Sequence, residues 1–153
     1  MTILFAVLKV LHLLFAVLWV GGMFFAYVVL RPSMTAIDPP QRMLLHTRVF
    51  RRFFLVVWHA MPAMLITGFG MLYLIGGSGG MASLPWTLHA MAGLGILMSA
   101  VFLAIVFGPY RRFRRTTDRA RMAASLDSIR KLIAVNLLLG LITVIVGALY
   151  GAI

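Results

Sequence analysis

Histidine is the residue of this chain best suited to binding a metal ion or a haem iron, and the chain has four. There is no cysteine, which excludes disulfides, thiolate metal sites, iron–sulfur clusters and c-type haem attachment. The three carboxylates, Asp38, Asp118 and Asp127, lie in or beside basic segments. No Ser/His/Asp, Cys/His or paired-carboxylate arrangement is present, which argues against hydrolytic chemistry and leaves catalytic residues unassigned.

Two of the histidines, His12 and His89, follow the start of a long apolar run by only a few residues. If both runs cross a membrane in the same direction, the two imidazoles lie at the same depth, in the outer leaflet. A low-spin b-type haem needs two axial ligands at one level on facing helices. The sequence therefore predicts a haem b held by His12 and His89 for electron transfer, with a quinone or a redox protein as partner.

Three further residues are candidates for the walls of this haem pocket. Trp19 and Gly22 share the helical face of His12, and Gly93 follows His89 by one turn. A glycine close to a ligand lets a flat macrocycle approach the backbone. We therefore assign Trp19, Gly22 and Gly93 to cofactor binding.

The other two histidines are weaker candidates. His59 lies on a run that crosses in the opposite direction, so its depth matches less well, and a metal or haem role there is a minor alternative. Because it lies three residues before Pro62, it is expected to donate to a backbone carbonyl that the proline frees. His46 lies in a basic loop and is expected to be solvated.

Copper is the alternative metal, because the chain has 11 methionines and thioether sulfur is a soft ligand that selects Cu(I). Methionine also fills gaps between apolar helices. Since no methionine array is expected to face His12, we interpret most of them as packing residues.

Composition places these histidines in a membrane protein. The 153 residues are 63% hydrophobic and 11% charged, against about 45–50% and about 25% in soluble domains. Four apolar runs have the length of about 20 residues that crosses a bilayer: 10–30, 53–75, 86–108 and 132–153. The prediction is an all-α bundle of four transmembrane helices forming a single domain over residues 1–153.

The basic residues set the predicted orientation. All but Lys9 of the 14 basic residues lie in the segments 31–52 and 111–131, whereas the loop 77–85 is uncharged. The positive-inside rule then places the basic segments in the cytoplasm and both termini outside. The chain is predicted to be a multi-pass protein of the bacterial inner (plasma) membrane. Its net charge of +11 reflects this topology and contact with lipid headgroups, and nucleic acid binding is not predicted.

Short motifs along nearly the whole chain resemble one membrane family. The first run carries Lys9, His12, Trp19 and Gly22 at the spacing of the copper-resistance D (CopD-like) family and of the related HemJ-type protoporphyrinogen oxidases. Similar motifs follow at Arg31-Pro32, Arg51-Arg52-Phe53, Trp86-Thr-Leu-His89 and Arg130-Lys131 with Asn136. The resemblance implies a haem ligand at the position of His12.

Two departures from the HemJ-type pattern argue against a simple transfer of that reaction. His89 stands where those enzymes carry a lysine, and residues 134–137 replace their Asn-Glu-Val-Pro. The alternatives that remain are copper uptake or delivery, a protoporphyrinogen oxidase, and a non-catalytic subunit of a larger membrane complex. Gly140 and Gly147 offer a close-packing face for a helix of the same chain or of a second copy, and Asn136 is expected to bond to another helix.

Overall fold

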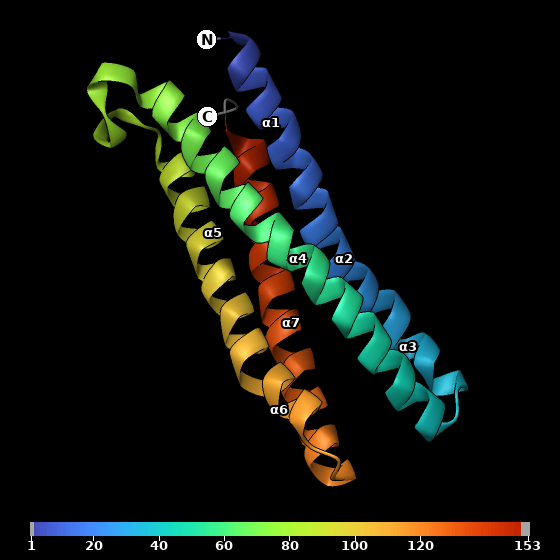
Figure 1. Cartoon of the computed structure of the whole chain (residues 1–153). Helices are drawn as coiled ribbons and strands as arrows, with labels where there is room; N and C mark the ends of the chain where they lie inside the picture. Colours follow the sequence, from blue (N-terminus) through green and yellow to red (C-terminus); the bar gives the residue numbers. More distant parts are fainter. Residues whose placement is uncertain (1, 151–153) are drawn as a thin grey trace.

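The computed structural model describes residues 2–150, and they form four long helical rods (Figure 1). The first rod comprises α1 (Thr2–Ala16), η1 (Val17–Gly21), α2 (Gly22–Phe24), η2 (Phe25–Leu30), α3 (Arg31–Ser33) and η3 (Met34–Ala36). The second rod is α4 (Pro39–Gly76). The third comprises α5 (Trp86–Ile105), η6 (Val106–Tyr110) and α6 (Arg111–Arg115), and the fourth is α7 (Arg119–Leu149).

The ends of the rods follow from local chemistry. Pro39 occupies the first turn of α4, where its missing N–H leaves no hydrogen bond unmade. Gly77 ends that helix with φ +47°, a backbone conformation that favours glycine. Short turns at η4 (Gly77–Gly79) and η5 (Met81–Ser83) lead to α5. At the other side of the bundle, the Asp118 carboxylate accepts from the Ala120 N–H at 2.9 Å and caps α7.

All four rods are long and apolar enough to cross a membrane, so the predicted all-α, multi-pass class is confirmed. The helices extend beyond the predicted spans. At 1.5 Å per residue, the 38 residues of α4 reach about 57 Å, against about 30 Å of hydrocarbon. The basic segment 41–50 forms the first turns of α4, because no helix-breaking residue separates it from Phe53.

The rods associate as two pairs, α1 with α4 and α5 with α7 (Figure 1). Glycines allow close approach at the contacts. A Cβ atom at Gly22 would lie 2.8 Å from the Phe53 ring, and one at Gly140 would lie 3.0 Å from Val20. Gly140 therefore packs against a helix of the same chain, which is one of the two expected arrangements.

The core is uneven along the bundle. We call the end that carries the chain reversals near Asp38 and Asp118 the basic end; the first residues of α1 and the last of α7 lie at the opposite end (Figure 1). A cluster of aromatic side chains fills the half near the basic end: Trp19, Phe50, Phe54, Phe102, Tyr110 and Phe113. The opposite half has a small buried cluster of three leucines, Leu72, Leu84 and Leu88.

Asn136 belongs to the tightly packed half of the bundle. Its side chain is 1% exposed, which agrees with the prediction of a buried amide. Its Oδ1 has no hydrogen-bond partner within residues 2–150, so the expected bond to another helix through this oxygen is not present.

Candidate functional site

His12 lies at the contact between α1 and α4. Its Nδ1 is 2.9 Å from the Thr67 Oγ1. The Thr67 hydroxyl also lies 2.6 Å from the Ala63 carbonyl oxygen, one turn earlier in α4. A carbonyl can only accept, so the single hydroxyl proton of Thr67 goes to Ala63, and Thr67 accepts from the His12 Nδ1–H. The neutral His12 ring therefore keeps its lone pair on Nε2, the nitrogen that can bind a metal.

Gly68 fixes the position of the His12 ring on α4. A Cβ atom at Gly68 would lie 3.0 Å from His12 Cε1 and 3.6 Å from its Nδ1. Any side chain at this position would force the ring to shift by a few tenths of an ångström. The glycine and the threonine together orient His12 in the way that a hydrogen-bonded neighbour orients a metal-binding histidine.

Two methionines share the α4 face that His12 contacts. Met64 and Met71 lie one turn before and one turn after Thr67 and Gly68, and both are half-buried. The Thr67 hydroxyl also lies 3.2 Å from the Met64 carbonyl oxygen. This arrangement could not be predicted from the sequence, because the depth of His12 along its helix does not identify α4 as the helix that packs on it. The interval of seven residues between Met64 and Met71 does indicate that the two side chains share one face of a helix.

The second predicted haem ligand has different surroundings. His89 is exposed on the first turn of α5, and its Nδ1 donates to the Pro85 carbonyl at 3.2 Å. His12 packs on α4, whereas α5 packs mainly on α7 (Figure 1). No hydrogen bond joins His12 and His89 within residues 2–150, and their shared ligation of one iron stays a prediction.

His59 donates from Nδ1 to the Leu55 carbonyl of its own helix at 2.8 Å and is exposed. It therefore donates to a backbone carbonyl as expected, but not to the one that Pro62 frees. In an α-helix the proline releases the carbonyl four residues before it, which belongs to Trp58.

The three predicted pocket residues have separate roles in the structure. Trp19 is buried, with its ring edge-on to Phe102 at a centroid distance of 6.2 Å. Gly22 allows Phe53 to approach α2. Gly93 is exposed, and a Cβ atom there would meet nothing within 4 Å. Helix packing accounts for the first two, and the assignment of all three to a cofactor stays a prediction.

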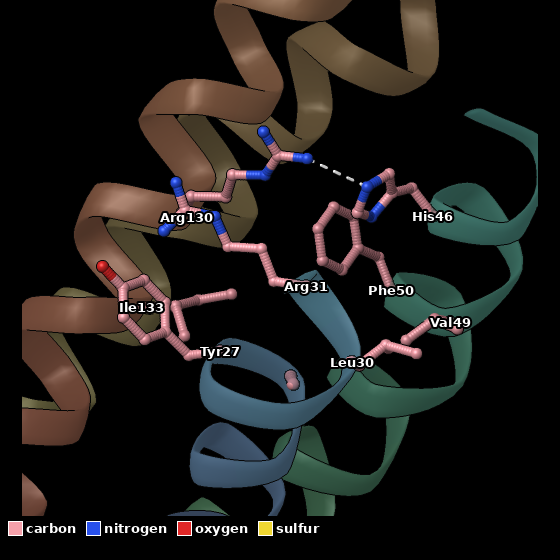
Figure 2. Close-up of a pocket in the computed structure, with 9 residues that line it drawn as sticks. Tyr27, Leu30, Arg31, His46, Val49, Phe50, Arg130 and Ile133 are labelled. Atoms are coloured by element: carbon pink, nitrogen blue, oxygen red, sulfur yellow. Dashed lines mark hydrogen bonds between the residues drawn. The ribbon is translucent and has the colours of Figure 1, made fainter. Parts of the chain in front are cut away.

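His46 is buried at the basic end, so the expectation that it is solvated was wrong. It is 5% exposed, and its Nε2 lies 3.0 Å from Arg130 Nη2 of α7 (Figure 2). An arginine can only donate, so His46 Nε2 accepts and the ring is neutral. His46 lies on the basic extension of α4 before Phe53, outside the predicted span. Burial, together with the nearby positive charges of Arg130 and Arg42, lowers its pKa to about 4.

A helical pattern could have identified the burial of His46. Phe50 and Phe54 follow it at intervals of four residues, and both belong to the aromatic cluster. Because residues four apart share a helix face, His46 continues that buried face toward the basic end.

The described part of the chain has few side chains that are placed together to bind a metal. Residues 2–150 contain no group of three or more His, Cys, Asp or Glu side chains placed to hold a metal ion. A metal site in this part of the chain would therefore rely on at most two such side chains together with methionine or backbone donors, or on a second molecule.

Four membrane-length helices with basic residues concentrated at one end define a multi-pass integral membrane protein. The sequence model of copper resistance protein D matches residues 47–150, which is more than half of the chain. The chain therefore belongs to the copper resistance protein D family. The match includes Thr67, Gly68 and His89 but not His12. No curated protein and no solved structure matches the chain significantly.

Proposed function

We propose that the protein binds monovalent copper at His12 as its cargo, within the contact between α1 and α4. The observation that carries the proposal is the hydrogen bond from His12 Nδ1 to Thr67, which leaves Nε2 as the free ring nitrogen. The name of the family, copper resistance protein D, supports copper as the metal.

The donor set suits Cu(I). Imidazole nitrogen and thioether sulfur are both ligands that copper accepts, and thioethers favour the monovalent ion. Met64 and Met71 supply thioethers on the α4 face that His12 contacts. Cu(I) carries only one charge, so a site without carboxylates avoids the cost of burying anions among apolar helices.

The residues around His12 would act as follows. The Thr67 hydroxyl holds the imidazole in the tautomer that presents Nε2, and Gly68 leaves room for the ring against α4. Because the large aromatic cluster does not extend into this half of the bundle, where only three leucines form a buried cluster, α1 and α4 would be able to shift as an ion enters or leaves. The protein would thus accept copper from one membrane face and deliver it within the bilayer or beyond it.

A titration of purified protein in detergent tests the proposal. Under anaerobic conditions with a chromogenic Cu(I) competitor, the wild type is expected to bind one Cu(I) per chain. His12→Ala should lose this binding, whereas the matched control His59→Ala, at an exposed histidine of the same bundle, should retain it. The proposal fails if the wild type binds no copper or if the two variants behave alike.

Haem b is the second candidate, favoured by the same anchored ring of His12. A histidine whose Nδ1–H is held by an oxygen is oriented for axial ligation through Nε2. In this candidate the haem supplies electron transfer, and His89 is the second ligand. Because His89 lies exposed on α5, it would have to reach the iron through a shift of α5 or from a second copy of the chain.

An absorption spectrum separates the two candidates. A reduced-minus-oxidised spectrum with a sharp α band that His12→Ala and His89→Ala both abolish would establish the haem protein. Protein that stays colourless after haem reconstitution, while binding copper, would exclude it.

We also propose that the basic end faces the cytoplasm, since positively charged segments are retained there. The chain has no cysteine, so single cysteines introduced at the exposed positions Ala82 and Thr117 can be labelled selectively in intact cells. A membrane-impermeant maleimide should label Ala82→Cys and leave Thr117→Cys unlabelled. The reverse result would contradict this orientation.

A further inference from the structure

Three rods bring basic side chains together at a small pocket of the basic end (Figure 2). Arg31 comes from α3, His46 from α4 and Arg130 from α7. The Arg31 guanidinium also lies over the Tyr27 ring, 5.2 Å from its centroid. No carboxylate lines the pocket: among the described residues Asp127 bonds to Lys131 at 2.8 Å, and Asp118 lies 3.6 Å from Arg121.

The positive charges in this region repel one another. Burial lowers the pKa of Arg130, and the nearby positive charges of Arg31 and Arg42 lower it as well, while Asp127 acts in the opposite direction. Such a concentration of positive charge without an acidic neighbour in the pocket favours an anion from outside the chain.

Two donors at the pocket have no acceptor in the described part of the protein. Arg130 Nε is buried and unpaired. His46 accepts from Arg130 at Nε2, so the proton of its neutral ring is on Nδ1, for which the structure shows no partner. A buried donor without an acceptor, such as Arg130 Nε, is costly, and an anionic oxygen at this position would satisfy it and could also accept from the His46 Nδ1–H.

The other side of the pocket is apolar. Leu30, Val49, Phe50 and Ile133 line it together with Ala26 and Tyr27. Its free interior is about 20 Å³, which is room for one water-sized group. A large soluble ligand could not enter, whereas a headgroup could place one oxygen among the donors and leave its tail against the apolar helices.

We propose that this pocket binds the phosphate group of an anionic membrane lipid. Arg31, Arg130 and the His46 Nδ1–H donate to the phosphate, and the acyl chains lie along the apolar surface of the adjacent helices. The lipid bridges α3, α4 and α7 at the level where these rods leave the hydrocarbon. This inference is independent of the metal that His12 binds.

Native mass spectrometry of the detergent-solubilised protein tests this site, with phosphatidylglycerol and phosphatidylcholine as probes. The wild type is expected to bind phosphatidylglycerol at least tenfold more tightly than phosphatidylcholine. Arg31→Gln should remove most of this preference, and Arg31→Lys should restore much of it. Arg31 suits the test because it is exposed and makes no side-chain hydrogen bond in the described structure, so the fold should tolerate the change.

Arg48→Gln is the matched control. Arg48 is an exposed residue of the same basic segment, but it lies on the opposite face of α4 from His46. The Arg48→Gln substitution should change the preference for phosphatidylglycerol over phosphatidylcholine less than twofold. Equal binding of the two lipids, or an equal loss in Arg48→Gln and Arg31→Gln, would overturn the site. Inorganic phosphate that displaces the lipid at millimolar concentration would overturn the lipid assignment in favour of a soluble anion.

Discussion

His12 and His46 are each held through a different ring nitrogen, Nδ1 in His12 and Nε2 in His46. The nitrogen that stays free, and therefore the kind of ligand that each ring can bind, differs between the two ends of the bundle. His12 donates from Nδ1 to a threonine and keeps a lone pair on Nε2. His46 accepts an arginine N–H at Nε2 and keeps a proton on Nδ1. The first ring can bind a cation and the second can bind an anion. A single neighbouring side chain thus decides what each histidine can do.

The two histidines also differ in how many buried side chains surround them. His46 adjoins the aromatic cluster, with its ring centroid 5.5 Å from that of Phe50. His12 lies beyond this cluster, where few side chains are buried. A rigid end suits a fixed anchoring site, and a looser end suits a site that an ion must enter and leave.

Removal of a central aromatic ring should have the largest effect on stability. Phe54 is 5% exposed and its ring contacts Tyr110 at a centroid distance of 4.6 Å. Phe54→Ala should cost about 3–5 kcal/mol through the cavity it leaves. Leu72→Ala, in the opposite half, should cost about 2 kcal/mol, because the side chains around it can collapse more easily.

The measurement is the unfolding of both variants in the same detergent. The comparison between the two ends breaks down if Leu72→Ala lowers the unfolding midpoint as much as Phe54→Ala does.

The Thr67 hydroxyl should control copper affinity. Thr67→Val keeps the shape of the side chain but removes the acceptor for His12 Nδ1–H, so the ring can turn and present the wrong nitrogen. Loss of such an orienting partner typically weakens metal binding by about 10–100-fold. Thr67→Ser keeps the hydroxyl and should stay within about threefold of the wild type, since the hydrogen bond can still form.

A Cu(I) competition titration of both variants checks this prediction. Equal affinities of Thr67→Val and Thr67→Ser would show that the hydroxyl does not orient the ligand.

A side chain at Gly68 should have a smaller effect than loss of the hydroxyl. The Cβ of Gly68→Ala would lie 3.0 Å from His12 Cε1, so the ring must shift by a few tenths of an ångström. We expect copper affinity to fall by about three- to tenfold, because the orienting hydrogen bond lengthens but persists. Gly95→Ala, where a Cβ meets nothing within 4 Å, is the control and should leave affinity unchanged. Identical titrations of the two alanine variants would contradict a close His12–Gly68 contact.

Much of the architecture could be predicted from the sequence. The four helices and the multi-pass class follow from apolar runs of bilayer length, a signal that lies within each segment. The neighbours of His12 could not be predicted in the same way, since depth along a helix does not reveal which helix a residue faces. His12 and His89 were matched by depth, but His12 packs on α4 through Thr67 and Gly68.

His46 shows a second limit of sequence reasoning. The surrounding arginines indicated a solvated loop, yet the residue continues the buried face of Phe50 and Phe54. Net charge in a segment describes its average environment, while helical phase decides the burial of each residue.

The last effect we predict is the pH dependence of stability that His46 introduces. The groups around its ring are Arg130 of α7, Arg31 of α3 and Arg42 of α4 itself. With a pKa of about 4 in the folded protein and its ordinary value of 6.5 when unfolded, His46 takes up a proton in the unfolded state first. The stability it contributes is complete above pH 6.5 and is lost as the pH falls toward 4. His46→Gln retains an acceptor for Arg130 but has no group that titrates in this range. The unfolding midpoint of the wild type should therefore fall more steeply between pH 6.5 and 4 than that of His46→Gln. Parallel curves for the two proteins would show that folding does not lower the pKa of His46.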